Sequence, residues 1–189
     1  MRAIGDVILE IDAGLTALGV RHAFGGALAL AYYAEPRGTV DVDINVGVPY
    51  ESRMALLRQL EGIGWHADDE DAQSVSAGGT RLHQVDETVV IDLFFAFDDF
   101  HGVVLDRAVV KPFLHAGDRH ELQFLSADDL VVFKISFGRS KDWVDIEAMI
   151  NAGTAIDPDY VERQLVQIKG PTAYPLVARL RALLRHQPQ

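Results

Sequence analysis

Two aspartates spaced two residues apart are the first residues in this sequence that suggest chemistry. Asp41 and Asp43 lie within 39–46, where polar residues alternate with β-branched apolar ones. Because side chains alternate across a β-strand, both carboxylates should point to one face. Two carboxylates this close repel each other unless a cation lies between them, and Mg²⁺, or Mn²⁺ in its place, prefers such oxygen ligands. The pattern predicts a metal site, with the solvated face of an edge strand as the alternative.

A third aspartate lies in a second apolar segment. Asp92 is surrounded by the apolar residues of 89–95, where a single buried carboxylate is costly without a partner. If this segment and 39–46 form neighbouring strands, Asp92 completes a cluster of three carboxylates. Such a cluster can bind two metal ions about 3.5–4 Å apart, an arrangement that supports in-line displacement at phosphorus. The alternative for Asp92 is a salt bridge at the end of a sheet.

A pair of glycines precedes these strands. Gly25 and Gly26 follow the short apolar segment 20–24 and precede 27–34, which is rich in good helix formers. Backbone N–H groups at such a strand-to-helix turn can face an anion, and phosphate suits that position. The alternative is a simple turn, so the value of the pair lies in its order along the chain, ahead of Asp41 and Asp43.

Basic residues occur near both ends of this arrangement. Arg37 and Thr39 come just before the aspartate strand, and the Arg37 guanidinium can hold a phosphate, pair with a carboxylate or be an ordinary loop charge. Lys134, Arg139 and Lys141 fall within eight residues of one another and form a local basic cluster in a chain that is acidic overall. Asp142 and Asp145 can orient these cations, and a solvated helix face is the alternative.

The periodicity of the chain changes near residue 126. Helical spacing predicts helices at 4–18, 27–34 and 50–63, and further on at 127–137, 140–151, 158–168 and 172–186. Strands are expected at 20–24, 39–46, 74–76, 81–85, 88–95, 103–110 and 121–125. Ser126 should cap the helix that follows it. We therefore expect an α+β protein with a catalytic core at 1–125 and a helical C-terminal region at 126–189.

Composition narrows the function classes. The chain has 189 residues and a net charge of −11. It has no cysteine, so disulfide frameworks and thiolate metal sites are excluded. Its seven histidines show no zinc-binding spacing. The sequence has no long apolar run and no apolar N-terminal leader. We therefore expect no membrane partner and a cytoplasmic location. The negative charge disfavours a broad surface for nucleic acid. The sequence leaves the oligomeric state open.

Taken together, these motifs resemble those of a known superfamily. Gly25-Gly26, the run 37–43 (RGTVDVD) and Asp92 are similar to motifs of the DNA polymerase β-like nucleotidyltransferases, in particular the minimal bacterial branches related to the AbiEii toxin nucleotidyltransferases. The runs 125–130 (LSADDL) and 139–145 (RSKDWVD), with Lys134 between them, also resemble those branches. The resemblance covers about residues 20–150. Gly26 stands where many members of the superfamily have serine, so backbone N–H groups would take over the role of that hydroxyl.

The resemblance implies a nucleotidyltransferase fold, with a mixed sheet flanked by helices, and a role for each motif. Asp41, Asp43 and Asp92 would bind Mg²⁺, and Asp92 would alternatively activate the acceptor. Lys134 would neutralise phosphate charge as a catalytic residue. The residues implied to bind the nucleotide are Gly25, Gly26, Arg37, Thr39, Arg139 and Lys141.

The implied reaction is transfer of a nucleoside monophosphate from a nucleoside triphosphate (NTP) to an acceptor, with release of pyrophosphate. The acceptor is left open among tRNA, a protein and a small molecule, and the acidic surface favours a small or cationic one. The alternative function is a non-catalytic nucleotide-binding or partner-binding member of a toxin–antitoxin-like pair. A metal-dependent phosphohydrolase would release inorganic phosphate instead of pyrophosphate.

Overall fold

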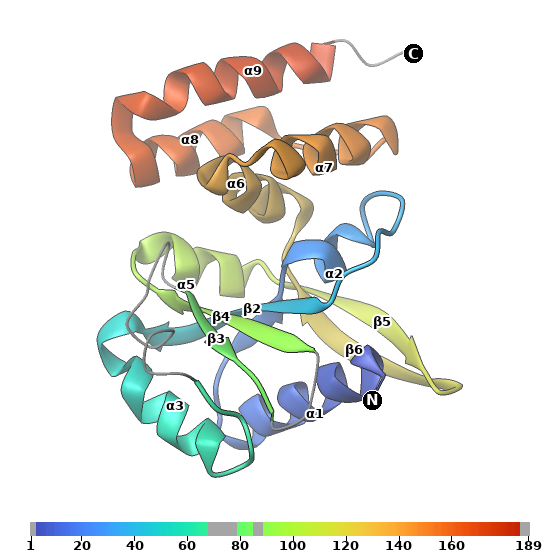
Figure 1. Ribbon diagram of the computed structural model, residues 1–189. Coiled ribbons are helices and arrows are strands. Elements are labelled where there is room, and N and C mark those ends of the chain that lie inside the picture. Colours follow the sequence, from blue (N-terminus) through green and yellow to red (C-terminus); the bar gives the residue numbers. More distant parts are fainter. Residues whose placement is uncertain (1–2, 68–78, 85–88, 186–189) are drawn as a thin grey trace. The chain divides into compact units, whose positions relative to one another are not determined.

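The computed structural model in Figure 1 describes residues 3–67, 79–84 and 89–185. The chain divides into two compact units. The first, here called the sheet unit, comprises Met1–Leu28 and Gly38–Leu125. The second, the helical unit, comprises Ala29–Arg37 and Ser126–Gln189. The short segment 29–37 therefore belongs with the C-terminal helices, although it lies between the glycine pair and the aspartate strand in sequence.

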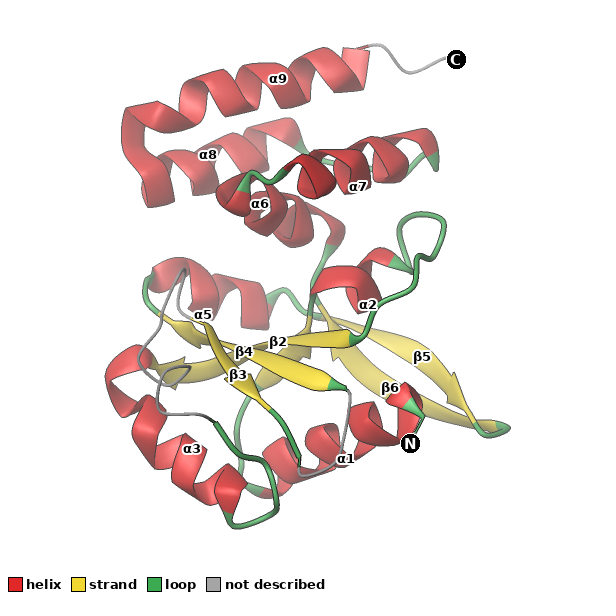
Figure 2. Cartoon of the chain, viewed as in Figure 1, coloured by secondary structure: helices red, strands yellow, loops and turns green. Residues whose placement is uncertain are grey.

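The sheet unit is built on a mixed six-stranded sheet in the order β3-β4-β2-β1-β6-β5 (Figure 2). The strands are β1 (His22–Phe24), β2 (Asp41–Pro49), β3 (Gly79–Leu82), β4 (Val90–Ala96), β5 (Val109–His115) and β6 (Asp118–Phe124). Strand β2 runs parallel to β4, and β1 runs parallel to β6, whereas the other neighbouring pairs are antiparallel. The predicted α+β class with a mixed sheet is confirmed.

Helices complete the sheet unit. They are α1 (Ile4–Ala17), the start of α2 (Gly26–Leu30), α3 (Arg53–Glu61), which follows the one-turn η1 (Tyr50–Ser52), and α5 (Asp99–Asp106). Helices α1 and α3 lie along one face of the sheet (Figure 1). The period of two in β2 and β4 supplies much of the core, because Val42, Ile44, Ile91 and Leu93 all point to one face and are fully buried.

Three sequence expectations differ from the structure or fall outside it. The prediction of a strand at 103–110 is wrong, because 99–106 forms α5 and strand β5 begins only at Val109. Asp98 starts α5 by accepting a hydrogen bond from the backbone N–H of His101, an N-cap that outweighs the β-propensity of the valines. The helix expected at 27–34 ends at Leu30, where turn hydrogen bonds replace the helical ones. The strand expected at 74–76 lies outside the described residues.

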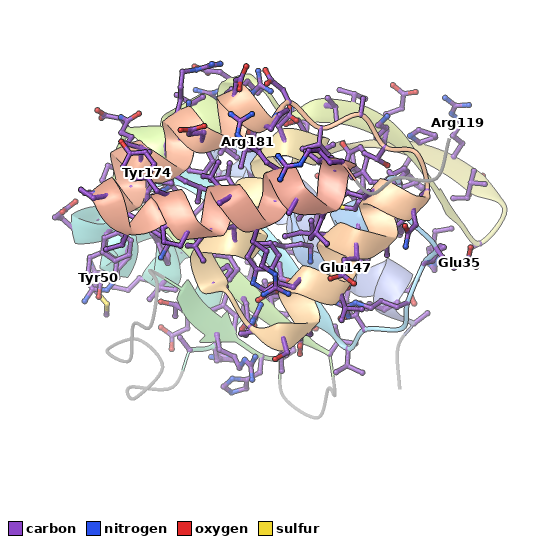
Figure 3. All side chains as sticks on the ribbon, turned by 90° about the horizontal axis from the view of Figure 1, so that it is seen from above. Glu35, Tyr50, Arg119, Glu147, Tyr174 and Arg181 are labelled. Carbon is purple, nitrogen blue, oxygen red and sulfur yellow. The ribbon has the colours of Figure 1, made fainter. Side chains whose placement is uncertain are left out.

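The helical unit contains the C-terminal helices and the segment 29–37. The helices are α6 (Ala127–Phe137), α7 (Ser140–Asn151), α8 (Pro158–Lys169), the one-turn η2 (Gly170–Ala173) and α9 (Tyr174–Arg185). Figure 3 shows α9 in full length, with Tyr174 at its start. The predicted cap at Ser126 is confirmed, since its side chain accepts a hydrogen bond from the Asp129 N–H. Segment 29–37 is held by the Thr154 hydroxyl, which donates to the Tyr33 carbonyl.

Across the residues that the structure describes, we find no helix with the length and apolar character needed to cross a bilayer.

Truncating a core side chain of β4 tests the layer assignment. We expect Leu93→Ala to lower the free energy of unfolding by about 2–5 kcal/mol, because Leu93 is fully buried and its loss leaves a cavity. The matched control is Leu114→Ala on edge strand β5, where the side chain is 75% exposed and the change should stay within about 0.5 kcal/mol. Urea unfolding curves measure both, and equal effects would contradict the assignment.

Candidate functional site

The three aspartates share one face of the sheet unit. Strands β2 and β4 are hydrogen-bonded neighbours in parallel register, with Asp43 directly beside Asp92 and Asp41 beside Val90. All three carboxylate-bearing residues are half-buried, and they alternate with the fully buried core residues of the same strands. Neighbouring strands lie about 4.8 Å apart, so Asp43 and Asp92 are close like charges. We call this surface, defined by Asp41, Asp43 and Asp92, the carboxylate face.

An arginine from the next strand holds one of these aspartates. Arg81 lies beside Asp92 in the antiparallel register of β3 and β4. Its Nε and Nη2 atoms donate to the two carboxylate oxygens of Asp92, each at 2.8 Å. Arg81 was not among the site residues predicted from sequence, although a salt bridge at Asp92 was allowed for. The sequence offered one signal for Arg81, which is its positive charge in the short strand predicted at 81–85.

The donor set of the carboxylate face suits a hard divalent cation. Asp41 and Asp43 offer carboxylate oxygens on one face, as Mg²⁺ or Mn²⁺ requires. Within the described part of the chain, no group of three or more His, Asp or Glu side chains converges into a metal-binding cluster, so the three aspartates do not form one as they stand. Asp92 is instead held by Arg81. The residues therefore fit a cation on the Asp41 and Asp43 side of the face.

The glycine pair is in contact with the carboxylate face. Strand β1 ends at Phe24, and the Gly25 N–H donates to the backbone carbonyl of Asp43 at 2.8 Å. Gly26 has a φ of +52°, and a Cβ atom built on it would overlap the Asp43 carboxylate. A Cβ on Gly25 would come within 3.2 Å of Asn45 Nδ2. Only glycine at Gly26 lets the backbone approach Asp43 so closely.

This geometry refines the predicted role of the glycines. The N–H of Gly25 binds the backbone carbonyl of Asp43 within the sheet unit, and the predicted contact of Gly25 with a phosphate stays a prediction. Helix α2 is only five residues long, so its dipole is small. Thr39, the other predicted nucleotide-binding residue of this unit, donates its hydroxyl to the Asp41 carbonyl at 3.0 Å and accepts from the Asp41 N–H at 3.2 Å. Thr39 thereby fixes the start of β2.

The predicted cations Arg37 and Lys134 lie in the helical unit and share one carboxylate. Arg37 donates to both oxygens of Asp145, through Nε and Nη2 at 3.0 Å each. Lys134 Nζ donates to Asp145 Oδ2 at 2.5 Å, and both side chains of this second pair are buried. Burial alone would raise the pKa of Asp145, but the hydrogen bonds from Arg37 and Lys134 outweigh it and lower the pKa below its ordinary value.

The remaining predicted cations begin α7. Arg139 donates to both oxygens of Asp142, at 2.7 Å and 3.1 Å, and its guanidinium lies over the Phe137 ring. Lys141 is exposed. The structure thus brings Arg37 and Lys134 together on Asp145 and places Arg139 on a separate carboxylate. Their predicted contacts with a nucleotide remain predictions.

Comparison with solved structures identifies the architecture. An antigenic nucleotidyltransferase-like protein from Paracoccidioides brasiliensis matches with a TM-score of 0.53 at 17% identity, covering 92% of this chain and 91% of that chain. The antibiotic-resistance factor ANT(2'')-Ia matches with a TM-score of 0.56 at 13% identity, covering 94% and 96%. The chain has a nucleotidyltransferase fold. A second structure of that factor, in complex with adenylyl-2''-tobramycin, matches with a TM-score of 0.53 at 14% identity, covering 94% and 97%.

Comparisons at the level of sequence give no match, either among protein-family models or among curated proteins. The nucleotidyltransferase fold is therefore recognised from the three-dimensional arrangement of the elements.

Replacing Gly26 tests the contact between the glycine turn and the carboxylate face. Gly26→Ala adds a methyl group that overlaps Asp43, at a backbone position that already has a positive φ. Gly19→Ala is the matched control, because Gly19 also has a positive φ but open space around it. We expect Gly26→Ala to lower the free energy of unfolding by about 1–3 kcal/mol more than Gly19→Ala does. Equal losses in chemical denaturation would rule out the overlap.

Acid unfolding tests the Asp145 ion pairs. Because the pKa of Asp145 is lowered in the folded state, its contribution to stability is present above its unfolded pKa of about 3.9 and is lost as the pH falls through the folded pKa. Asp145→Asn should remove this part of the pH dependence. At neutral pH it should cost about 3–5 kcal/mol, because Lys134 is left buried without its anion.

The matched control for this measurement is Asp159→Asn. Asp159 is largely exposed and binds Arg181, which is labelled on α9 in Figure 3, so its loss should cost no more than about 1 kcal/mol. Unfolding free energies of the three proteins between neutral and strongly acidic pH give the comparison. An Asp145→Asn protein that is as stable as the control would contradict the assigned pairing.

Proposed function

We propose that the chain is a metal-dependent nucleotidyltransferase that transfers a nucleoside monophosphate from an NTP to an acceptor hydroxyl and releases pyrophosphate. The observation that carries this proposal is the register of β2 and β4, which places Asp43 beside Asp92, on the face of Asp41, next to the glycine turn. The nucleotidyltransferase fold supports it. Catalysis would come mostly from positioning and charge neutralisation.

The residues of the carboxylate face have two different tasks in this scheme. Asp41 and Asp43 would hold Mg²⁺ or Mn²⁺, which supplies positive charge against the phosphate oxygens. The acceptor oxygen forms a bond to the α-phosphorus while the bond from that phosphorus to the bridging oxygen breaks, and pyrophosphate leaves. Asp92 would accept the proton of the acceptor hydroxyl, provided that the hydroxyl lies within hydrogen-bonding reach. The absence of a side chain at Gly26 lets the glycine turn lie directly against Asp43.

For the substrates, we propose ATP and a small, cationic or neutral acceptor. The adenylyl group in the tobramycin complex of ANT(2'')-Ia supports ATP as the donor. The net charge of −11 favours a small cationic acceptor over a long polyanion such as tRNA. A mass shift of one nucleoside monophosphate on a candidate acceptor, after incubation with each NTP in turn, identifies both substrates.

Pyrophosphate release provides the decisive test of the reaction. The protein is incubated with Mg²⁺, each NTP and a panel of acceptors, and pyrophosphate is measured. The double variant Asp41→Asn, Asp43→Asn should be slower by about a hundredfold or more, because it loses the cation that neutralises the phosphates. Asp118→Asn, at the exposed start of β6, is the control for loss of a surface carboxylate and should keep the wild-type rate.

The other outcomes of the same assay are also distinct. Equal rates in the wild type and the double variant would remove the metal-site proposal. Inorganic phosphate in place of pyrophosphate would indicate a phosphohydrolase. Tight NTP binding in calorimetry with no product after long incubation would favour the non-catalytic member of a toxin–antitoxin-like pair.

A further inference from the structure

The ion pair between Arg81 and Asp92 has a consequence for how many cations the carboxylate face can bind. The Arg81 guanidinium donates to both oxygens of Asp92 at 2.8 Å, in the bidentate geometry that is the strongest for this pair of groups. The pair is anchored at both ends by backbone pairing, because Arg81 and Asp92 are register partners in β3 and β4. Its position is therefore a property of the sheet.

A cation at Asp92 would have to displace this guanidinium. Each oxygen of Asp92 accepts a hydrogen bond from Arg81, and a divalent ion beside a guanidinium is strongly repelled at this distance. Asp41 and Asp43, in contrast, lie on β2, which β4 separates from the Arg81 strand β3. A divalent cation at Asp41 and Asp43 is thus one strand further from the guanidinium, whereas Asp92 is in direct contact with that positive charge.

The charge balance of the face supports the same conclusion. Asp41, Asp43 and Asp92 together carry three negative charges when ionised. One guanidinium and one divalent cation neutralise these charges completely, whereas a second divalent cation would leave an excess of positive charge in the absence of phosphate. This count of formal charges favours a single metal ion on the nucleotide-free face.

We propose that Arg81 is a positioning residue that takes the place of a second metal ion, so that the nucleotide-free protein binds one divalent cation, at Asp41 and Asp43. This inference rests on the proposed function, because it concerns the same metal site. It assigns to Arg81 two linked effects: it fixes the Asp92 carboxylate next to Asp43, and it excludes a cation from Asp92. Since the Arg81 side chain is about half exposed, replacing it should leave the core of the sheet intact.

Titration with Mn²⁺ alone, followed by electron paramagnetic resonance, tests the proposal without any need for turnover. Free Mn²⁺ is measured as it is added to the nucleotide-free protein. The wild type should bind one ion. Arg81→Met removes the charge and keeps a long, unbranched side chain. It should bind a second ion, with an affinity about tenfold or more above any weak second binding that the wild type shows.

Two further variants make the result specific. Arg81→Lys retains the charge but not the bidentate contact, so its second affinity should fall between those of the wild type and Arg81→Met. Arg119→Met removes an exposed arginine that pairs with Glu121, at the β5–β6 hairpin (Figure 3), and should bind one ion like the wild type. Thermal unfolding of each variant confirms that the protein measured is folded.

The possible results separate this inference from the proposed function. Two ions of similar affinity in the wild type, or no gain in Arg81→Met and Arg81→Lys, would overturn the role of Arg81 and leave the proposed metal site standing. Loss of the single wild-type ion in Asp43→Asn supports that site. No Mn²⁺ binding by the wild type would overturn both.

Discussion

The structure depends on the parallel pairing of β2 and β4. One face of this pair carries fully buried aliphatic side chains, and the other carries Asp41, Asp43 and Asp92. The hydrophobic face fixes the register, because a shift by one residue would bury the carboxylates and expose the core. The same register forces two like charges side by side at Asp43 and Asp92. The energy that folds the sheet thus also holds together a group of charges that repel each other, and the Arg81 guanidinium on Asp92 offsets part of this repulsion.

In each of the two units, an arginine stabilises an aspartate carboxylate through two hydrogen bonds. In the sheet unit, the guanidinium of Arg81 spans both oxygens of Asp92. In the helical unit, Arg37 spans both oxygens of Asp145, and Lys134 adds a third hydrogen bond from a buried position. A bidentate arginine satisfies a buried or half-buried carboxylate with two well-directed donors, which a single lysine cannot do. Lys134 is accordingly tied to Asp145 within its own unit, rather than standing as a lone cation.

Local periodicity and capping chemistry made part of the fold predictable from the sequence. The alternation in 39–46 correctly indicated strand β2 and the common face of Asp41 and Asp43, and the Ser126 cap was predicted from its local hydrogen-bonding chemistry. Local patterns failed where they conflicted: the valines of 103–110 suggested a strand, yet the Asp98 cap starts α5 before them. Contacts between distant residues were out of reach, since Arg81 meets Asp92 only through the register of β3 and β4. The same is true of Arg37 and Asp145, which are far apart in sequence.

The path of the chain between the two units governs how the protein can be divided. The chain passes from one unit to the other after Leu28, after Arg37 and after Leu125. A fragment that stops at Leu125 would keep 29–37 but lose Thr154 and Asp145, the residues that bind Tyr33 and Arg37. Segment 29–37 would then connect Gly26 to Asp41 without these contacts to hold it. Fragments of this protein should therefore be made by replacing 29–37 with a short linker, not by cutting the chain once.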